Sequence, residues 1–384
     1  MNIPAEFDEI RPYTPEELPQ IFDELTSDPA FRSVIQTFIP NVPLEILIKK
    51  LHQCKTNLDV QKAFFYDLLQ DIVKKHSDGL DLDSSAIPDK TMNYTFISNH
   101  RDIVLDSGLL SIALLDNGYP TTVEIAIGDN LLIYPWIKKL VRINKSFIVQ
   151  RALSMRQMLE SSARMSRYMH FAISEKKENI WIAQREGRAK DSNDRTQDSV
   201  LKMLAMGGEG DIIDRLKELN IVPLSLSYEY DPCDYLKAQE MQQKRDIEGF
   251  KKTQMDDLNN MQTGIFGYKG RIHFHADQCI NDELEKLRSL PKNEIFTSIS
   301  NLIDKSIHTH YRLYPGNYVA LDLLENTTRF TNQYTDKDKA KFIAYLNGRI
   351  DLIELENKDE NFLSECILTM YANPVRNHLA AINQ

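Results

Sequence analysis

The chain has 384 residues, with 46 basic and 56 acidic side chains that give a net charge of −10. This acidic balance argues against nucleic acid as the main partner, because phosphate backbones are bound through basic surfaces. The length and the apolar content of 42% predict a globular protein of two or three domains.

Cysteine spacing and hydropathy indicate in which cellular compartment we expect the protein. The four cysteines, Cys54, Cys233, Cys279 and Cys366, form no CxxC pair, so we expect neither a disulfide framework nor a bound metal, and a reducing compartment fits. No apolar run has the length of a signal peptide or the ~20 residues that span a bilayer. We therefore expect a cytoplasmic protein, either soluble or peripheral on the inner face of the membrane.

The first 90 residues contain two segments with different sequence patterns. Residues 14–76 are helical in pattern, with apolar residues recurring at Phe64, Leu68, Leu69 and Ile72 on one helix face, and we expect residues 1–76 to form a small N-terminal helical domain. Residues 77–90 are rich in Asp and Ser and contain Gly79 and Pro88, which is typical of a linker.

Strands and helices alternate over residues 91–317. Amphipathic helical segments separate most of the short apolar strands, which favours an α/β fold with a mostly parallel central sheet flanked by helices. The predicted strands are Tyr94–Ile97, Thr122–Ala126, Phe147–Val149, Ile180–Ala183, Val222–Tyr228 and Gly270–Phe274. We interpret the polar stretch 236–262 as a solvated helical excursion, and residues 318–384 as a C-terminal helical extension.

The first candidate for chemistry is His100. An apolar strand delivers Ser98, Asn99 and His100 into a polar turn, with Asp106 a few residues on. Histidine can take and return a proton near pH 7, and a nearby carboxylate fixes its tautomer. This pair predicts a general base at the carboxyl end of a buried strand.

Three further blocks follow strand ends or edges. Phe147-Ile148 leads to Arg151, whose planar fork of donors suits a phosphate or carboxylate. The next strand ends in Glu186-Gly187-Arg188, with Lys190 close behind, and Val222-Pro223 opens another strand.

Taken in order, Asn99-His100, Phe147-Ile148 with Arg151, Glu186-Gly187-Arg188 and Val222-Pro223 resemble the four motifs of the glycerolipid acyltransferase family. The resemblance implies transfer of an acyl group from acyl-CoA or acyl-carrier protein to a hydroxyl of glycerol-3-phosphate or a lysophospholipid, without a cofactor. It implies His100 and Asp106 as the catalytic pair. Arg151, Arg188 and Lys190 would hold the acceptor phosphate, and Glu186 and Gly187 would shape its site. The helical domain that precedes the motifs favours glycerol-3-phosphate as acceptor.

The chain departs from the family pattern in two places. Five residues lie between His100 and Asp106, where the family usually has four, and the residue that normally separates the Gly and the Arg of the third block is missing. A position six residues on lies ~120° around a helix axis. Asp106 can therefore reach His100 only if His100 precedes the helix, and Asp102 competes for the orienting role.

Several interpretations stay open. Arg151 and Arg188 could form surface ion pairs with Glu160 or Asp191. A metal-dependent hydrolase using His273, His275 and Asp277 is the alternative activity, and a catalytically silent lipid-binding protein is a third reading. The segment from Tyr134 to Val141 suits either a membrane interface or a core helix. The methionines at 155, 158, 165 and 169 suit either core packing or an acyl-chain wall.

Overall fold

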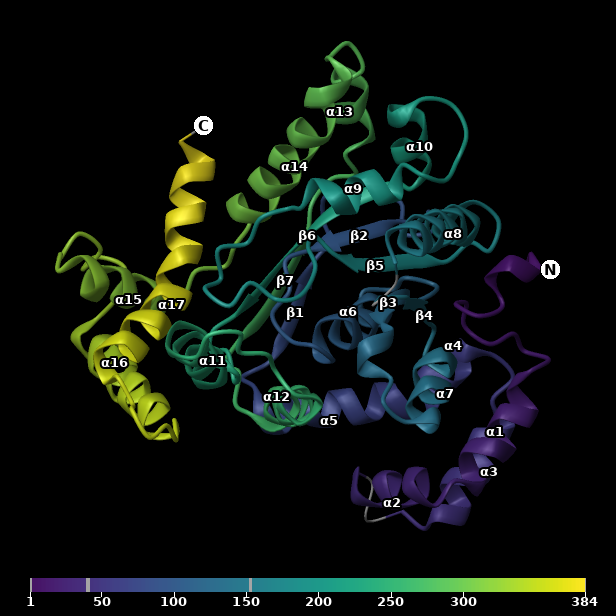
Figure 1. Ribbon diagram of the computed structural model, residues 1–384, viewed down its shortest axis with the longest axis horizontal. Coiled ribbons are helices and arrows are strands. Elements are labelled where there is room, and N and C mark those ends of the chain that lie inside the picture. The colour runs from purple at the N-terminus through teal and green to yellow at the C-terminus, as the bar shows by residue number, and fades with distance from the viewer. Residues whose placement is uncertain (1, 39–41, 152–153, 384) are drawn as a thin grey trace.

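The computed structural model describes residues 2–38, 42–151 and 154–383, and it is built around one seven-stranded sheet (Figure 1). The strand order is β1-β7-β6-β2-β5-β3-β4. The strands are β1 (Leu80–Asp83), β2 (Thr95–Ser98), β3 (Val123–Gly128), β4 (Ser146–Val149), β5 (Asn179–Ala183), β6 (Ile221–Tyr228) and β7 (Ile272–Ala276).

The sheet is mostly parallel, which confirms the predicted α/β class. Strands β2 to β6 run in one direction, whereas β7 is antiparallel to β6 and β1 is parallel to β7. The carboxyl ends of five strands therefore meet at one edge, where α/β proteins place their ligands. β7 ends toward the opposite edge.

Side chains alternate between the two faces of each strand and form two cores. Ile97, Ile180 and Ile182 belong to one core, while Phe96 and Trp181 belong to the other. The first core is closed by α8 (Met155–Ser174), α9 (Asp198–Leu204), α10 (Ile212–Glu218), α13 (Asn281–Lys286) and α14 (Lys292–Thr309). The second is closed by α5 (Tyr66–His76) and α6 (Leu105–Asp116), so helices cover both faces (Figure 1).

The N-terminal residues are helical, as expected. They comprise η1 (Ala5–Phe7), α1 (Leu18–Ser27), α2 (Pro29–Phe38), α3 (Leu44–Gln53), α4 (Asn57–Val60) and a short π-helix, η2 (Gln61–Phe65). Helices α1 to α3 share a small core with α7 (Pro135–Ile143), whereas Phe7 and α5 pack into the cores of the sheet. The boundary at residue 76 stays a prediction.

The segment 77–90, which we expected to be a linker, contributes the edge strand β1. Leu80 and Leu82 pair with Ile272 and Phe274 of β7, and Leu82 packs into the second core. The aspartates that favoured a linker flank Leu82 on the other side of the strand and contact the histidines of β7. A four-residue strand is too short for a pattern of alternation to stand out.

The stretch 236–262 is helical, but it is not simply solvated. Helices α11 (Asp234–Asp246) and α12 (Gln254–Phe266) bury Lys237, Glu240, Gln242 and Asn260. The reason is that their polar side chains bind polar partners in the protein. Glu240 accepts ion pairs from three lysines, and Asn260 contacts Arg188.

The C-terminal helices α15 (Pro315–Glu325), α16 (Asp336–Asp351) and α17 (Glu360–Ile382) form a core of their own with Ala238 of α11. They lie on the β1 side of the sheet, while α1 to α3 lie on the other side of the molecule (Figure 1).

Candidate functional site

His100 lies in the turn between β2 and α6, before the helix begins at Leu105. This is the placement that the six-residue spacing requires. His100 Nδ1 lies 2.7 Å from Asp106 Oδ2, with the histidine side chain 14% exposed and the carboxylate fully buried. A carboxylate only accepts hydrogen bonds, so Nδ1 carries the hydrogen and Nε2 keeps its lone pair.

Asp106 is held by further donors. The backbone N–H groups of Arg101 and Asp102 donate to Oδ2 at 2.7 and 3.1 Å, and the Tyr228 hydroxyl donates to Oδ1 at 2.9 Å. Burial, followed by the charge of Asp106, raises the pKa of Tyr228 well above its ordinary value, so the phenol stays a donor.

Asp102, the competitor for the orienting role, has other partners. Its Oδ1 accepts from the backbone N–H groups of Val104 and Leu105 at 2.9 and 2.7 Å, which fixes the turn that leads into α6. A Cβ on Gly264 of α12 would lie 1.9 Å from Asp102 Oδ2, so the packed α12 backbone needs glycine there. Burial and the nearby Asp106 raise the pKa of Asp102.

Residues on both sides of His100 are anchored. Asn99 exchanges two hydrogen bonds with Leu226 of β6, its amide donating to the carbonyl at 2.9 Å and its oxygen accepting from the N–H at 2.8 Å. The Arg101 guanidinium binds both carboxylate oxygens of Asp194, at 3.0 and 2.6 Å, and Tyr311 donates to the same group at 2.5 Å. Sequence reasoning missed Asp194, Tyr228 and Tyr311, since each lies far along the chain from His100.

The second and third blocks meet at the same edge. Arg151 follows β4 and pairs with Glu186, which follows β5, at 3.2 Å between Nη1 and Oε1. The backbone N–H of Arg151 donates to Asp129 of η3 (Asp129–Leu131) at 3.1 Å. Glu160, a predicted partner of Arg151, pairs with Arg156 instead. Both Arg151 and Glu186 keep substantial exposure, at 38% and 73%.

Arg188 lies deeper than Arg151. Gly187 takes the left-handed conformation, with φ of 67°, as the chain turns inward after Glu186. Arg188 donates through Nη2 to Asn260 Oδ1 at 3.1 Å, while its Nη1 is buried without a partner among the described residues. Burial lowers its pKa, but Cys233 and Asp102 outweigh that effect, so the pKa is raised and the guanidinium stays charged.

Lys190 belongs to a basic cluster around Glu240. Its ammonium pairs with Glu240, which also binds Lys244 at 2.9 Å and Lys252 at 3.2 Å. Burial lowers the pKa of Lys190 to about 8. The ammonium of Lys190, which we expected to bind a phosphate, is therefore already paired with Glu240.

The structure does not bring the predicted metal set of His273, His275 and Asp277 together as a group. His273 Nδ1 lies 2.5 Å from Asp81 Oδ2 and His275 Nδ1 lies 3.3 Å from Asp83 Oδ2, both on β1. Asp277 lies against His310 instead. Because β7 runs against β6, Asp277 follows its carboxyl end away from the edge that carries His100.

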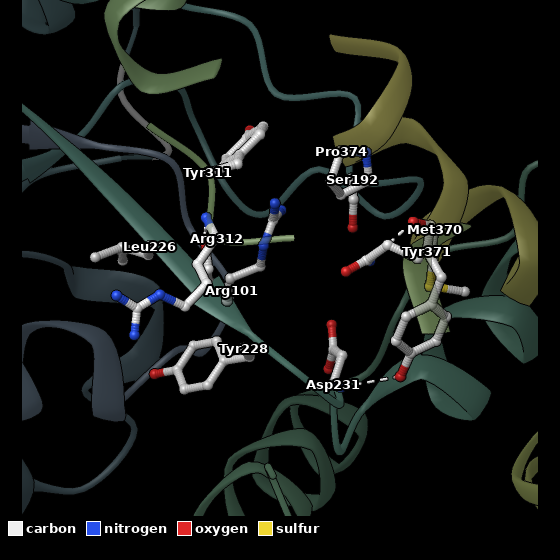
Figure 2. A pocket seen from close by; sticks show the side chains of 12 residues that line it. Arg101, Ser192, Leu226, Tyr228, Asp231, Tyr311, Arg312, Met370, Tyr371 and Pro374 are labelled. Atoms are coloured by element: carbon white, nitrogen blue, oxygen red, sulfur yellow. Dashed lines mark hydrogen bonds between the residues drawn. The ribbon is translucent and has the colours of Figure 1, made fainter. Parts of the chain in front are cut away.

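A pocket lies between the end of β6 and the middle of α17 (Figure 2). Arg101, Tyr228, Asp231 and Tyr371 line it, and Tyr228 reaches from it to Asp106. The Tyr371 hydroxyl accepts a hydrogen bond from the Asp231 backbone at 3.0 Å. The pocket thus lies between the C-terminal helix α17 and Tyr228, the residue that donates to Asp106.

The two apolar segments differ in their surroundings. On α7, Trp136 and Leu140 pack against the core of α1 to α3, the core-helix reading of that segment. On α8, Met165 and Met169 are buried, whereas Met155, Met158 and Leu159 are 82%, 52% and 60% exposed. The methionine stripe therefore splits into a core half and an exposed half.

No family model matches the chain, and no curated protein matches it. Among solved structures, the chain is similar to the 1-acyl-sn-glycerophosphate acyltransferase PlsC from Thermotoga maritima, with 12% identity and a TM-score of 0.37 over 76% of this chain and 93% of that one. Similarity at this level does not establish membership of a family. Within the described ranges, no helix combines the length and the apolar character that crossing a bilayer requires.

Proposed function

We propose that the protein is an acyltransferase that moves a fatty acyl group from an acyl thioester to a hydroxyl of glycerol-3-phosphate or a lysophospholipid. The observation that carries the proposal is the His100–Asp106 pair, at 2.7 Å, with Nε2 unpartnered within the described residues. The order of the four sequence blocks supports it, since Arg151 and Glu186 meet at the strand-end edge that also bears His100.

The proposed reaction needs no acyl-enzyme. His100 Nε2 takes the proton of the acceptor hydroxyl, and the oxygen attacks the thioester carbonyl. The new ester C–O bond forms and the thioester C–S bond breaks. The imidazolium returns its proton to the sulfur, so the donor leaves as a thiol. The buried Asp106 carboxylate steadies the positive charge on the ring between these two transfers.

Arg151 and Arg188 are the proposed ligands of the acceptor phosphate. Arg188 has a buried, unpartnered Nη1, and a guanidinium binds phosphate through several N–H groups at once. Arg151 is partly exposed and, among the residues that the structure describes, forms its ion pair with Glu186 alone, so a dianionic phosphate can compete for it. Glu186 would then position Arg151, and Lys190 would add positive charge from behind Glu240.

We further propose that the protein works in the cytoplasm as a peripheral protein on the inner membrane face. Every described residue from Ser154 to Glu160 is exposed, and Met155, Met158 and Leu159 lie there, directly after Arg151 in the chain. Apolar side chains on a protruding helix end can enter the acyl-chain boundary of a bilayer. This placement would bring a lipid acceptor close to the proposed phosphate ligands.

One experiment tests the activity. The pure protein is incubated with acyl-CoA or acyl-carrier protein, each with glycerol-3-phosphate or 1-acylglycerol-3-phosphate, while thiol release and lipid product are followed. We expect thiol release that depends on one acceptor. His100→Ala should abolish it, and His52→Ala on α3 should not.

Other outcomes separate the alternatives. Thiol release without any acceptor would indicate a thioesterase. Binding of lipid without thiol release from either donor would favour the silent lipid-binding protein. Either result overturns the proposed transfer.

A further inference from the structure

A second cluster of chemically capable side chains lies outside the proposed transfer site. His275 of β7, Asp277 just after that strand, and His310 just after α14 each offer one ligand atom within 4.8 Å of the others. Because Ile272, Phe274 and Ala276 point into the second core, His275 lies on the opposite face of β7. The cluster therefore joins a strand to a helix on the face that α14 covers.

Within the described residues, both histidines make their polar contacts through Nδ1, and in His310 that atom also lies 3.6 Å from Asp277 Oδ2. His310 Nδ1 lies 2.9 Å from the Ser306 carbonyl, which only accepts, so Nδ1 carries the hydrogen and Nε2 has a lone pair. His275 Nδ1 faces Asp83 at 3.3 Å, and its Nε2 is buried with no partner in the part of the chain that the structure describes. Histidines that bind a metal typically donate their other N–H to a carboxylate or carbonyl in this way.

Asp277 is also held in place. Its Oδ2 accepts from the Ser306 hydroxyl at 2.5 Å, and its Oδ1 accepts from the Gln278 backbone at 2.8 Å. Each carboxylate oxygen has a second lone pair, so a cation can still be bound.

We propose that His275, Asp277 and His310 form a zinc site that ties the end of β7 to the end of α14. Two imidazole nitrogens and one carboxylate oxygen suit Zn²⁺, with water in the fourth position. The site differs from the set first suggested by sequence spacing, because His310 replaces His273, whose ring binds Asp81. It does not depend on the proposed acyl transfer.

The orientation of the His275 and His310 rings must change before both can bind one ion. They stack with centroids 4.1 Å apart and planes 10° apart, so their lone pairs lie in two nearly parallel planes. One ring must tilt before both lone pairs converge on one ion. His310 follows the last helical residue and is 32% exposed, against 15% for His275, so His310 is the ring that moves.

The test uses the full chain, freed of metal with a chelator and dialysed. Titration with Zn²⁺ against a chromophoric chelator should show one equivalent bound, and the thermal midpoint should rise on binding. Asp277→Asn and His310→Gln should weaken binding at least ~10-fold, since even residues that only support a ligand contribute ~10–100-fold. His273→Gln is the matched control and should bind like the wild type, as should His100→Ala.

Co²⁺ provides a measurement on the wild-type protein in case a variant fails to fold. The bound ion should show the absorption of a four-coordinate site without a thiolate-to-cobalt charge-transfer band. Such a band would assign the ion to Cys279 or another cysteine and overturn the proposal. So would equal weakening in His273→Gln and His310→Gln, or the absence of stoichiometric binding.

Discussion

The Tyr228 hydroxyl donates to Asp106 Oδ1, the carboxylate oxygen that His100 does not use, at 2.9 Å. Tyr228 ends β6 and is 122 residues from Asp106 in the chain. The bond therefore connects the proposed base to a different strand and to the pocket beneath α17.

Tyr228→Phe removes this bond and leaves the ring in place. A hydrogen bond to a charged group is worth ~1.5–3 kcal/mol, so we expect the rate of thiol release to fall by up to ~10–100-fold. Steady-state assays check this, with the acceptor KM unchanged. An unchanged rate would show that Tyr228 does not support the pair.

Asp106→Asn and Asp102→Asn form a matched pair. An amide at position 106 can present its oxygen or its N–H to His100 and cannot stabilise the imidazolium by charge. We expect thiol release to fall by ~10²–10⁴, the range of general-base catalysis. At position 102, asparagine can still accept the hydrogen bonds from Val104 and Leu105, so activity and the thermal midpoint should change little. Equal losses in the two variants would contradict the assignment of Asp106.

Arg151→Gln should raise the KM for the acceptor more than it lowers kcat. The ion pair with Glu186 is exposed, and such pairs contribute at most ~1 kcal/mol to stability, so the thermal midpoint should stay in place. Arg156→Gln is the control, because Arg156 is also exposed and paired, with Glu160, on the next helix. If both variants behave alike, Arg151 is an ordinary surface residue.

The lowered pKa of the buried Lys269 predicts that the stability of the protein depends on pH. Burial lowers its pKa from 10.5 to about 8, so between these values the folded protein binds fewer protons than the unfolded chain. Stability then rises with pH across this window, and below about pH 8 the buried charge costs stability. Relative to Lys269→Met, the wild type should gain about 1 kcal/mol between pH 7 and pH 9.

Denaturant unfolding at the two pH values measures that gain, and the comparison cancels groups that titrate in both proteins. Lys286→Met, at an exposed lysine, should track the wild type. A constant difference between wild type and Lys269→Met would contradict the lowered pKa.

The exposed end of α8 predicts membrane contact. Met158→Asp with Leu159→Asp places two charges where apolar side chains would enter the bilayer, and should reduce co-sedimentation with anionic phospholipid vesicles. Thiol release with water-soluble glycerol-3-phosphate should persist. Ser162→Asp, one helical turn further along, is the control. Equal sedimentation of all three proteins would remove the lipid surface as a partner of α8.

The sequence alone predicted the class of fold because most strands of the sheet have apolar runs that stand out from their surroundings. It also placed His100 at a strand end and required a turn before α6, which the structure contains. The packing of α11 and α12 against the rest of the protein could not be predicted. Their polar residues, Glu240 and Asn260 among them, follow the pattern of a solvated helix. Their partners, Lys190 and Arg188, lie 50 and 72 residues away.

The same limit applied to the β7 histidines. An alternating His273 and His275 suggested a shared ion, but β1 pairs beside β7 and places Asp81 against His273. His310 joins His275 only through the packing of α14. Contacts between distant segments depend on topology, and neither residue's local pattern contains them.

The anchoring of Asn99 and Arg101 has a consequence for how a reaction at His100 would proceed. With one neighbour bound to β6 and the other to Asp194, the turn cannot adjust as charge develops on the imidazole. If His100 is the base, as proposed, it is preorganised, and little reorganisation energy would be spent in the transition state. In the proposed reaction, the acceptor would therefore have to bind with its hydroxyl already aligned on the imidazole ring.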